Sequence, residues 1–207
     1  MDEFKSANYV ELCGVAAGRP VFSHTSRSEQ FFQFPMEIDR LSGTTDRINI
    51  IVRETLLSSL EPPDTPECKL LVTGELRSFN NKSGEGSRLV ITVFAREITF
   101  CGLEDSNIVR LTGTLCKSPI LRATPMGREI CDLMLAVNRR YGRSDYLPCI
   151  AWGTKAKEAS LWNIGTVVSL TGRIQSRKYI KNIEGVPIEK TAFEVSVMDI
   201  CAEKSSQ

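Results

Sequence analysis

The chain repeats its own sequence at a nearly constant distance, and this repeat constrains the fold more than any other feature of its 207 residues. The stretches NYVELCG at 8–14 and NIVRLTG at 107–113 both read Asn-x-Val-x-Leu-x-Gly, 99 positions apart. Pro20 and Pro119 keep that spacing, and TGELRS at 73–78 precedes TGRIQS at 171–176 by 98 positions. The repeat predicts two copies of one domain, and we place them at residues 1–104 and 105–207.

Each copy is expected to form short β-strands and one short helix. In the second copy, NIVRLTGTL alternates apolar and polar residues, as a half-buried strand does. EICDLMLAV and DYLPCIAW follow as strands, then TKAKEASLWNIG as a helix that ends at Gly165, then strands over 167–180 and 191–200. This order predicts an all-β chain of two tandem OB-folds, which are five-stranded Greek-key barrels. Gly113 and Gly172 fit sharp bends in barrel strands.

The net charge of the chain, +1, hides an acidic and a basic copy. Residues 1–104 hold 11 Lys and Arg against 15 Asp and Glu, a net charge of −4. Residues 105–207 hold 15 against 10, a net charge of +5. A basic copy is typical of polyanion binding, because Lys and Arg that contact phosphates release condensed counterions. A solvated surface gives the same count, so both interpretations remain open.

Several classes of protein are disfavoured by the composition. No run of about 18 apolar residues exists and the N-terminus lacks an apolar signal core, so we expect a cytoplasmic protein with no membrane partner. The seven cysteines are odd in number and include no Cys-x-x-Cys pair, which favours reduced, mostly buried thiols. His24 is the single histidine, so we expect no metal site, no cofactor and no enzymatic activity.

Aromatic and basic residues share one predicted face of the second copy. On the third strand, Tyr146 and Trp152 alternate with Leu147, Cys149 and Ala151, which suit the barrel interior. On the fourth strand, the outward residues are predicted to be Arg173, Gln175, Arg177 and Tyr179, opposite inward Val168, Leu170 and Ile174. Exposed rings between arginines suit unpaired bases, because rings stack on base faces while guanidinium groups hold phosphates. The same rings could instead cover a protein interface.

The second copy resembles the bacterial single-stranded DNA-binding protein family, SSB, over about residues 106–201. The resemblance is carried by Asn-x-Val-x-Leu-x-Gly-x-Leu at 107–115, Pro-x-x-Arg-x-Thr-x-x-Gly at 119–127, AVNR at 136–139, WGTKA at 152–156 and GRIQSRKY at 172–179. In that family the rings that stack on DNA lie at positions matching Tyr141, Tyr146, Trp152 and Tyr179. The basic residues that we expect to contact nucleic acid are Arg122, Arg139, Arg140, Arg143, Lys155, Arg173, Arg177, Lys178 and Lys181.

The resemblance implies sequence-independent binding of single-stranded DNA in replication, recombination or repair. Family members assemble four OB-folds, so a chain with two implies a homodimer. It also implies a nucleoid-associated location and contacts with replication or primosome proteins. The family commonly ends in an acidic tail that recruits such enzymes, and DICAEKSSQ at 199–207 does not match it, which favours an accessory role. The alternatives are a PriB-like primosomal protein and an OB-fold adapter that binds only protein.

The first copy lacks all four rings at the matched positions, where it carries Ser42, Arg47, Arg53 and Asn81. Its own aromatic residues Phe32, Phe34, Phe94 and Phe100 are spaced for a core or a packing face. The hypothesis is that the first copy packs against other OB-folds, or adjusts DNA affinity weakly through Arg47, Arg53 and Arg77.

Overall fold

The computed structural model describes residues 7–60, 69–81, 89–139, 142–183 and 186–203, and it divides into two compact units. Unit 1 comprises Met1–Asn8, Ser78–Val90 and Val109–Gln207. Unit 2 comprises Tyr9–Arg77 and Ile91–Ile108. Each unit is built around its own barrel, and unit 1 takes in two short stretches from the first copy of the repeat, Met1–Asn8 and Ser78–Val90.

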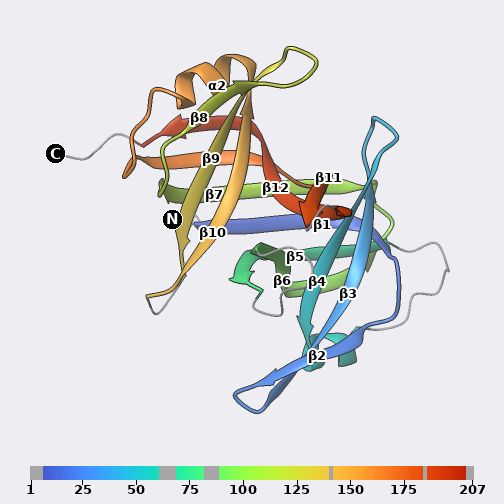
Figure 1. Cartoon of the computed structure of the whole chain (residues 1–207). Helices are drawn as coiled ribbons and strands as arrows, with labels where there is room; N and C mark the ends of the chain where they lie inside the picture. Colours follow the sequence, from blue (N-terminus) through green and yellow to red (C-terminus); the bar gives the residue numbers. More distant parts are fainter. Residues whose placement is uncertain (1–6, 61–68, 82–88, 140–141, 184–185, 204–207) are drawn as a thin grey trace. The chain divides into compact units, whose positions relative to one another are not determined.

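The barrel of unit 2 closes through five strands. These are β1 (Asn8–Ala16), β3 (Glu29–Asp39), β4 (Thr45–Arg53), β6 (Leu89–Cys101) and β5 (Lys69–Asn80), which neighbour each other in that order, with β5 returning to β1. β4 and β6 run parallel, and the helix α1 (Glu54–Ser58) lies between β4 and β5 in the chain. A further strand, β2 (Val21–Ser26), pairs with the outer edge of β3 (Figure 1).

The barrel of unit 1 has the same topology. β7 (Ser106–Leu115), β9 (Glu129–Asn138), β10 (Ser144–Trp152), β12 (Val186–Ala202) and β11 (Val167–Ile183) neighbour each other in that order, and β11 returns to β7. β10 and β12 run parallel, and the short strand β8 (Ile120–Ala123) pairs with β9. The helix α2 (Gly153–Ala159) contacts β9 and β10 (Figure 1). Its buried residues are Ala156 and Ala159. The prediction of two tandem OB-folds is thus confirmed.

The interior of each barrel is filled by the inward residues of alternating strands. Leu147, Cys149 and Ala151 are at most 1% exposed, and Val168, Leu170 and Ile174 are buried as well, which confirms both predicted inward sets. In unit 2, Phe34 belongs to the core as expected. Burial of such side chains away from water is the main stabilising term of a small barrel.

The predicted helix over 154–165 was too long. α2 ends at Ala159, and the backbone N–H groups of Ser160 and Leu161 donate to carbonyls of the last turn. Leu161 is exposed, and Trp162, which falls within the predicted helix, lies beyond the observed one and is half-buried. With no buried face after Ala159, the segment gains nothing by continuing as a helix.

Gly113 and Gly172 are required by close approach of a neighbouring strand. A Cβ on Gly113 would lie 2.9 Å from the carbonyl oxygen of Ala136, and one on Gly172 would lie 2.4 Å from that of Ser196. The register of β11 against β12 also shifts between Thr171 and Gly172. At the equivalent glycines of unit 2, Gly14 and Gly74, an added Cβ would lie 2.2 Å from a carbonyl oxygen, so both copies keep glycine where a neighbouring strand leaves no room for a Cβ.

Candidate nucleic-acid interface

One outer face of the unit 1 barrel collects three of the four predicted rings and two of the six predicted arginines. Residues paired across neighbouring strands point to the same side of a sheet. Ile150 on β10 pairs with Ser196 on β12, which pairs in turn with Arg173 on β11. The outer face, as we call it below, therefore carries Tyr146, Pro148, Ile150, Trp152, Arg173, Gln175, Arg177 and Tyr179.

The described rings of the outer face differ in how they are held. Tyr146 is 52% exposed, the most open of the three. Trp152 is half-buried, and its indole Nε1 donates to the Ser196 hydroxyl at 3.1 Å, which fixes the ring against β12. Tyr179 is half-buried beside Arg177, whose guanidinium carbon lies 5.8 Å from the ring centre. Tyr141 lies outside the described residues.

Carboxylates hold several of the predicted cations in place. Arg122 donates to both oxygens of Asp132, at 2.5 and 3.0 Å, and these hydrogen bonds raise the pKa of the guanidinium. Arg177 Nε lies 3.6 Å from an oxygen of the buried Glu194, which also accepts from Gln175 Nε2 at 3.0 Å. Such contacts orient a guanidinium and leave some of its five N–H donors for a ligand.

The remaining cations are spread over other elements. Lys155 on α2 pairs with Asp199 at 2.8 Å, a contact that raises the pKa of the ammonium and lowers the pKa of the carboxyl. Lys178 pairs with Glu189 at 3.0 Å. Among the described residues, Arg143 and Arg173 have no carboxylate partner. Arg140 and the side chain of Lys181 lie outside the described part of the chain.

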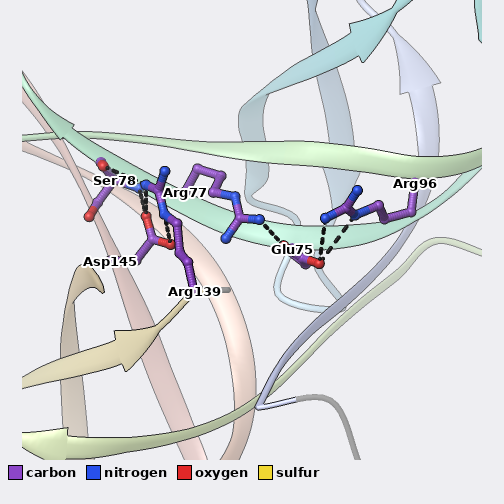
Figure 2. Close-up of polar contacts among 6 residues, drawn as sticks. All are labelled: Glu75, Arg77, Ser78, Arg96, Arg139 and Asp145. Atoms are coloured by element: carbon purple, nitrogen blue, oxygen red, sulfur yellow. Dashed lines mark hydrogen bonds and ion pairs between the residues drawn. The ribbon is translucent and has the colours of Figure 1, made fainter. Parts of the chain in front are cut away.

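Arg139 serves the fold of unit 1. Its Nε donates to Asp145 Oδ2 at 2.6 Å, a second nitrogen contacts Asp145 Oδ1, and the Asp145 carboxylate is fully buried. Figure 2 shows how Ser78 completes this cluster: its backbone N–H donates to Asp145 at 2.5 Å and its carbonyl accepts from Arg139 at 3.1 Å. The guanidinium is thus occupied by a buried carboxylate and a backbone carbonyl, so we leave Arg139 out of the ligand-contacting set.

Ser78 also supports the most exposed ring. Its hydroxyl oxygen accepts the backbone N–H of Tyr146 at 2.7 Å. Three polar groups of Ser78 therefore fix the start of β10 where the outer face begins. Sequence reasoning missed Ser78, and the usable signal was the match of Ser78 to Ser176 within the repeated TGxxxS stretch.

The described part of the chain offers little that suits other chemistry. It contains no group of three or more His, Cys, Asp or Glu side chains able to hold a metal ion. Over the same residues, no helix has the length and apolar character needed to cross a membrane.

Known proteins are similar to the second copy in sequence and to the whole chain in fold. Residues 106–202 match the model of the single-strand binding protein family. Single-stranded DNA-binding protein B of Bacillus subtilis is 38% identical over 103 residues, covering 45% of this chain and 90% of that protein. Single-stranded DNA-binding protein 3 of Streptococcus agalactiae is 32% identical over 109 residues, covering 49% and 78%.

Among solved structures, the single-stranded DNA binding protein from Thermus aquaticus superposes with a TM-score of 0.74 at 22% identity, covering 97% of this chain and 94% of that one. At this identity the likeness shows the fold, and it extends over both copies. The sequence matches over the second copy, joined to the two barrels, place the chain in the single-strand binding protein family.

Proposed function

We propose that the chain binds single-stranded DNA without sequence preference through the outer face of unit 1. The observation that carries this proposal is the placement of Tyr146 and Trp152 on one face with Arg173 and Arg177. Duplex DNA hides its base faces, whereas an unpaired base can lie flat on a ring. The relatives named above carry single-stranded DNA binding in their names, which supports the same ligand here.

Base stacking and phosphate contacts both contribute to the free energy of binding. Stacking on Tyr146, Trp152 and Tyr179 contributes about 1–3 kcal/mol per base and tolerates any base, because every base has a flat face. Arg122, Arg173, Arg177, Arg143, Lys155, Lys178 and Lys181 supply the phosphate contacts. These contacts make affinity fall as salt rises, with a slope of about −0.7 per phosphate on a log–log plot for single strands.

The same proposal extends to assembly and cellular role. Two barrels per chain, together with the four-barrel assemblies of the family, support a homodimer. We infer a non-catalytic, cytoplasmic protein that protects single strands during replication, recombination or repair. Contacts with replication or primosome proteins are part of this proposal.

The decisive experiment measures binding of oligo-dT to ring variants of the full chain. Tyr146→Ala, Trp152→Ala and Tyr179→Ala should each weaken binding by about 5- to 150-fold, the equivalent of 1–3 kcal/mol. Leu161→Ala, which removes an exposed apolar side chain away from the outer face, is the control and should bind like the parent chain. Circular dichroism verifies that each variant stays folded.

A second readout reports directly on the outer face. Trp162→Phe leaves Trp152 as the single tryptophan, and its fluorescence should be quenched as oligo-dT binds. Unquenched Trp152, or ring variants that bind as well as the control, would contradict the proposal. An adapter that binds only protein would show no oligo-dT binding at all.

A further inference from the structure

Two cysteine side chains of the unit 2 barrel meet at their sulfur atoms. Cys13 on β1 and Cys101, the last residue of β6, have their Sγ atoms 3.3 Å apart, although 88 positions separate them in the chain. The strands neighbour each other in the order β6, β5, β1, so this contact joins strands on opposite sides of β5. We call Cys13 and Cys101 the thiol pair. Cys116 and Cys149 place their sulfur atoms against backbone carbonyl groups instead.

Cys13 is buried although it lies on the outward side of its strand. Leu12 belongs to the core, and successive side chains of a strand point to opposite faces, so Cys13 points outward. Its side chain is nevertheless 0% exposed, and its Sγ also lies 3.8 Å from the carbonyl oxygen of Leu103. Cys101 is half-buried. A small molecule in solution therefore reaches the thiol pair through Cys101.

Unit 1 has no thiol at the two corresponding positions. Thr112 on β7 corresponds to Cys13 by the spacing of the repeat, and Glu203 corresponds to Cys101 because β12 pairs with β10 as β6 pairs with β4. Ser169 connects them, since its hydroxyl lies 2.8 Å from the Thr112 hydroxyl and donates to the Glu203 carboxylate. One barrel thus fills this place with hydrogen-bonded polar groups and the other with two thiols, so the fold itself does not require cysteine here.

A disulfide requires only a small movement from the observed arrangement. An S–S bond is about 2.05 Å long, so the two Sγ atoms have to approach each other by about 1.3 Å. Cys101 ends β6, and the chain leaves the sheet over residues 102–105. Its side chain therefore has more room to rotate than one in the middle of a strand. The thiol pair is close enough to be joined without unfolding the barrel.

We propose that Cys13 and Cys101 form a reversible disulfide when the protein meets hydrogen peroxide. The Cys101 thiolate attacks one peroxide oxygen, the O–O bond breaks, and hydroxide leaves and takes up a proton, so that Cys101 becomes a sulfenic acid. The Cys13 sulfur then attacks the Cys101 sulfur. The S–S bond forms, the S–O bond breaks, and the oxygen leaves as water with the proton of the Cys13 thiol. Overall, two thiols are oxidised to one disulfide while one peroxide is reduced to two waters.

The surroundings of the thiol pair assign these two roles. Burial raises the pKa of the Cys13 thiol, and the thiolate is the reactive form, so Cys13 does not react first. The positive charge of Lys69, which pairs with Asp105 at 2.6 Å, acts in the opposite direction on the pKa of Cys13 and favours loss of its proton in the second step. Capture by Cys13 also protects the Cys101 sulfenic acid from irreversible oxidation.

This inference goes beyond the proposed function and does not depend on it. In a reducing compartment the thiol pair stays reduced until an oxidant arrives, because intracellular disulfides are usually transient. Reduction by a dithiol then restores both thiols. The disulfide would therefore record exposure to peroxide in the first barrel, while the rings of the outer face lie in the second.

The test maps disulfides in the unaltered full chain. The fully reduced protein is treated with hydrogen peroxide, its remaining thiols are blocked with N-ethylmaleimide, and its peptides are analysed by mass spectrometry before and after dithiothreitol. The peptide joining Cys13 to Cys101 should exceed every other linked pair at least about tenfold, because contact replaces diffusion. The preference should vanish when oxidation is done in urea. A main product that involves any of the other five cysteines, or a preference that persists in urea, overturns the proposal.

Three single variants test the order of the two steps. In Cys13→Ser, the Cys101 sulfenic acid should accumulate and be trapped by dimedone, whereas in Cys101→Ser, Cys13 should keep its thiol. Cys201→Ser removes the exposed thiol and is the control, which should form the Cys13–Cys101 bond in the same yield as the parent chain. Oxidation of Cys13 in the Cys101→Ser variant, or loss of the bond in the control, overturns the proposed order. The mapping of the unaltered chain needs no variant and holds even if a variant fails to fold.

Discussion

At the scale of single residues, the repeat keeps a buried aspartate and its arginine in both copies. Asp145 accepts from Arg139 in unit 1, and Asp46 accepts from Arg40 Nε at 2.5 Å in unit 2. Both aspartates are fully buried, and in each pair the arginine precedes the aspartate by six positions. A buried carboxylate without its partner is costly, so these positions are constrained by folding.

Replacing Asp145 with asparagine should destabilise the chain markedly. The change leaves Arg139 facing a neutral amide, and we expect a loss of about 3 kcal/mol in the free energy of unfolding, at the low end for buried pairs because a quarter of the Arg139 side chain is exposed. Urea denaturation measures the loss. Asp199→Asn breaks an exposed pair with Lys155 and should leave the urea midpoint unchanged. Equal midpoints for the two variants would refute a structural role for Asp145.

The cysteines should differ sharply in reactivity. Burial, with further contributions from Cys101 at 3.3 Å, raises the pKa of the Cys13 thiol to about 12, and burial also raises the pKa of Cys149. The thiolate is the reactive form. Iodoacetamide at pH 8 should therefore modify exposed Cys201 first and spare Cys13 and Cys149, as read by mass spectrometry. Early modification of Cys13 in the folded chain would contradict this order.

The raised pKa of the Cys13 thiol also predicts how the free energy of unfolding changes with pH. Because the folded chain favours the protonated Cys13 thiol, its contribution is complete below the unfolded pKa of about 9. Above that pH the unfolded chain ionises first, and the contribution declines up to about pH 12. Cys13→Ala should flatten part of that decline in urea titrations.

A site residue could be predicted from the sequence when the residues that orient it lie on the same strand, and not when they lie far away in the sequence. Tyr146 and Trp152 alternate with small apolar residues on one strand, so their common direction follows from the strand period alone. Ser78 acts on Tyr146 from 68 positions away, and no local pattern encodes that pairing. Phe94 shares its face with Arg53 only through the β4–β6 pairing, which a sequence comparison at equal positions does not test.

At the scale of elements, the long barrel strands were predictable and the short ones were not. β7, β9 and β10 alternate buried and more open residues over most of their length, which gives a clear period. β8 is four residues long and exposed throughout, and β2 is almost as open, so neither carries an inside-outside pattern. They are strands because β9 and β3 offer free edges.

Gly172→Ala should disturb the contact between β11 and β12. Its Cβ would meet the Ser196 carbonyl oxygen at 2.4 Å, so a strand must move, and we expect a loss of about 2–3 kcal/mol in unfolding free energy. Because Ser196 holds Trp152, oligo-dT binding should weaken as well. Gly102→Ala meets nothing within 4 Å and should change stability by less than about 0.5 kcal/mol. Thermal or urea melts decide between these outcomes.

Ser78→Ala should weaken oligo-dT binding through Tyr146. The change removes the acceptor of the Tyr146 backbone N–H, at a cost of about 1–2 kcal/mol in stability. Its effect on affinity should vanish when Tyr146→Ala is already present, because the ring that Ser78 positions is then gone. Additive losses in the double variant would show that Ser78 acts on binding by another route.

At the scale of the whole molecule, the two barrels set the expected assembly. Light scattering should give a mass of twice the 23.1 kDa of the chain, since two chains bring four barrels together. The mass should hold across the concentrations used for oligo-dT binding. A mass equal to a single chain, or to four chains, would refute the proposed homodimer.

Unit 1 includes a segment of the first copy, so cutting the chain at the repeat junction would divide this unit. Ser78–Val90 belongs to the first copy by sequence and to unit 1 by its contacts, where Ser78 closes the Asp145 cluster. A fragment beginning at residue 105 would lack Ser78. The buried carboxylate of Asp145 would lose one hydrogen-bond donor, and the backbone N–H of Tyr146 would lose its acceptor. Recombination or truncation at the repeat junction would therefore separate the outer face from Ser78, which supports it, so the two halves cannot be exchanged as independent units.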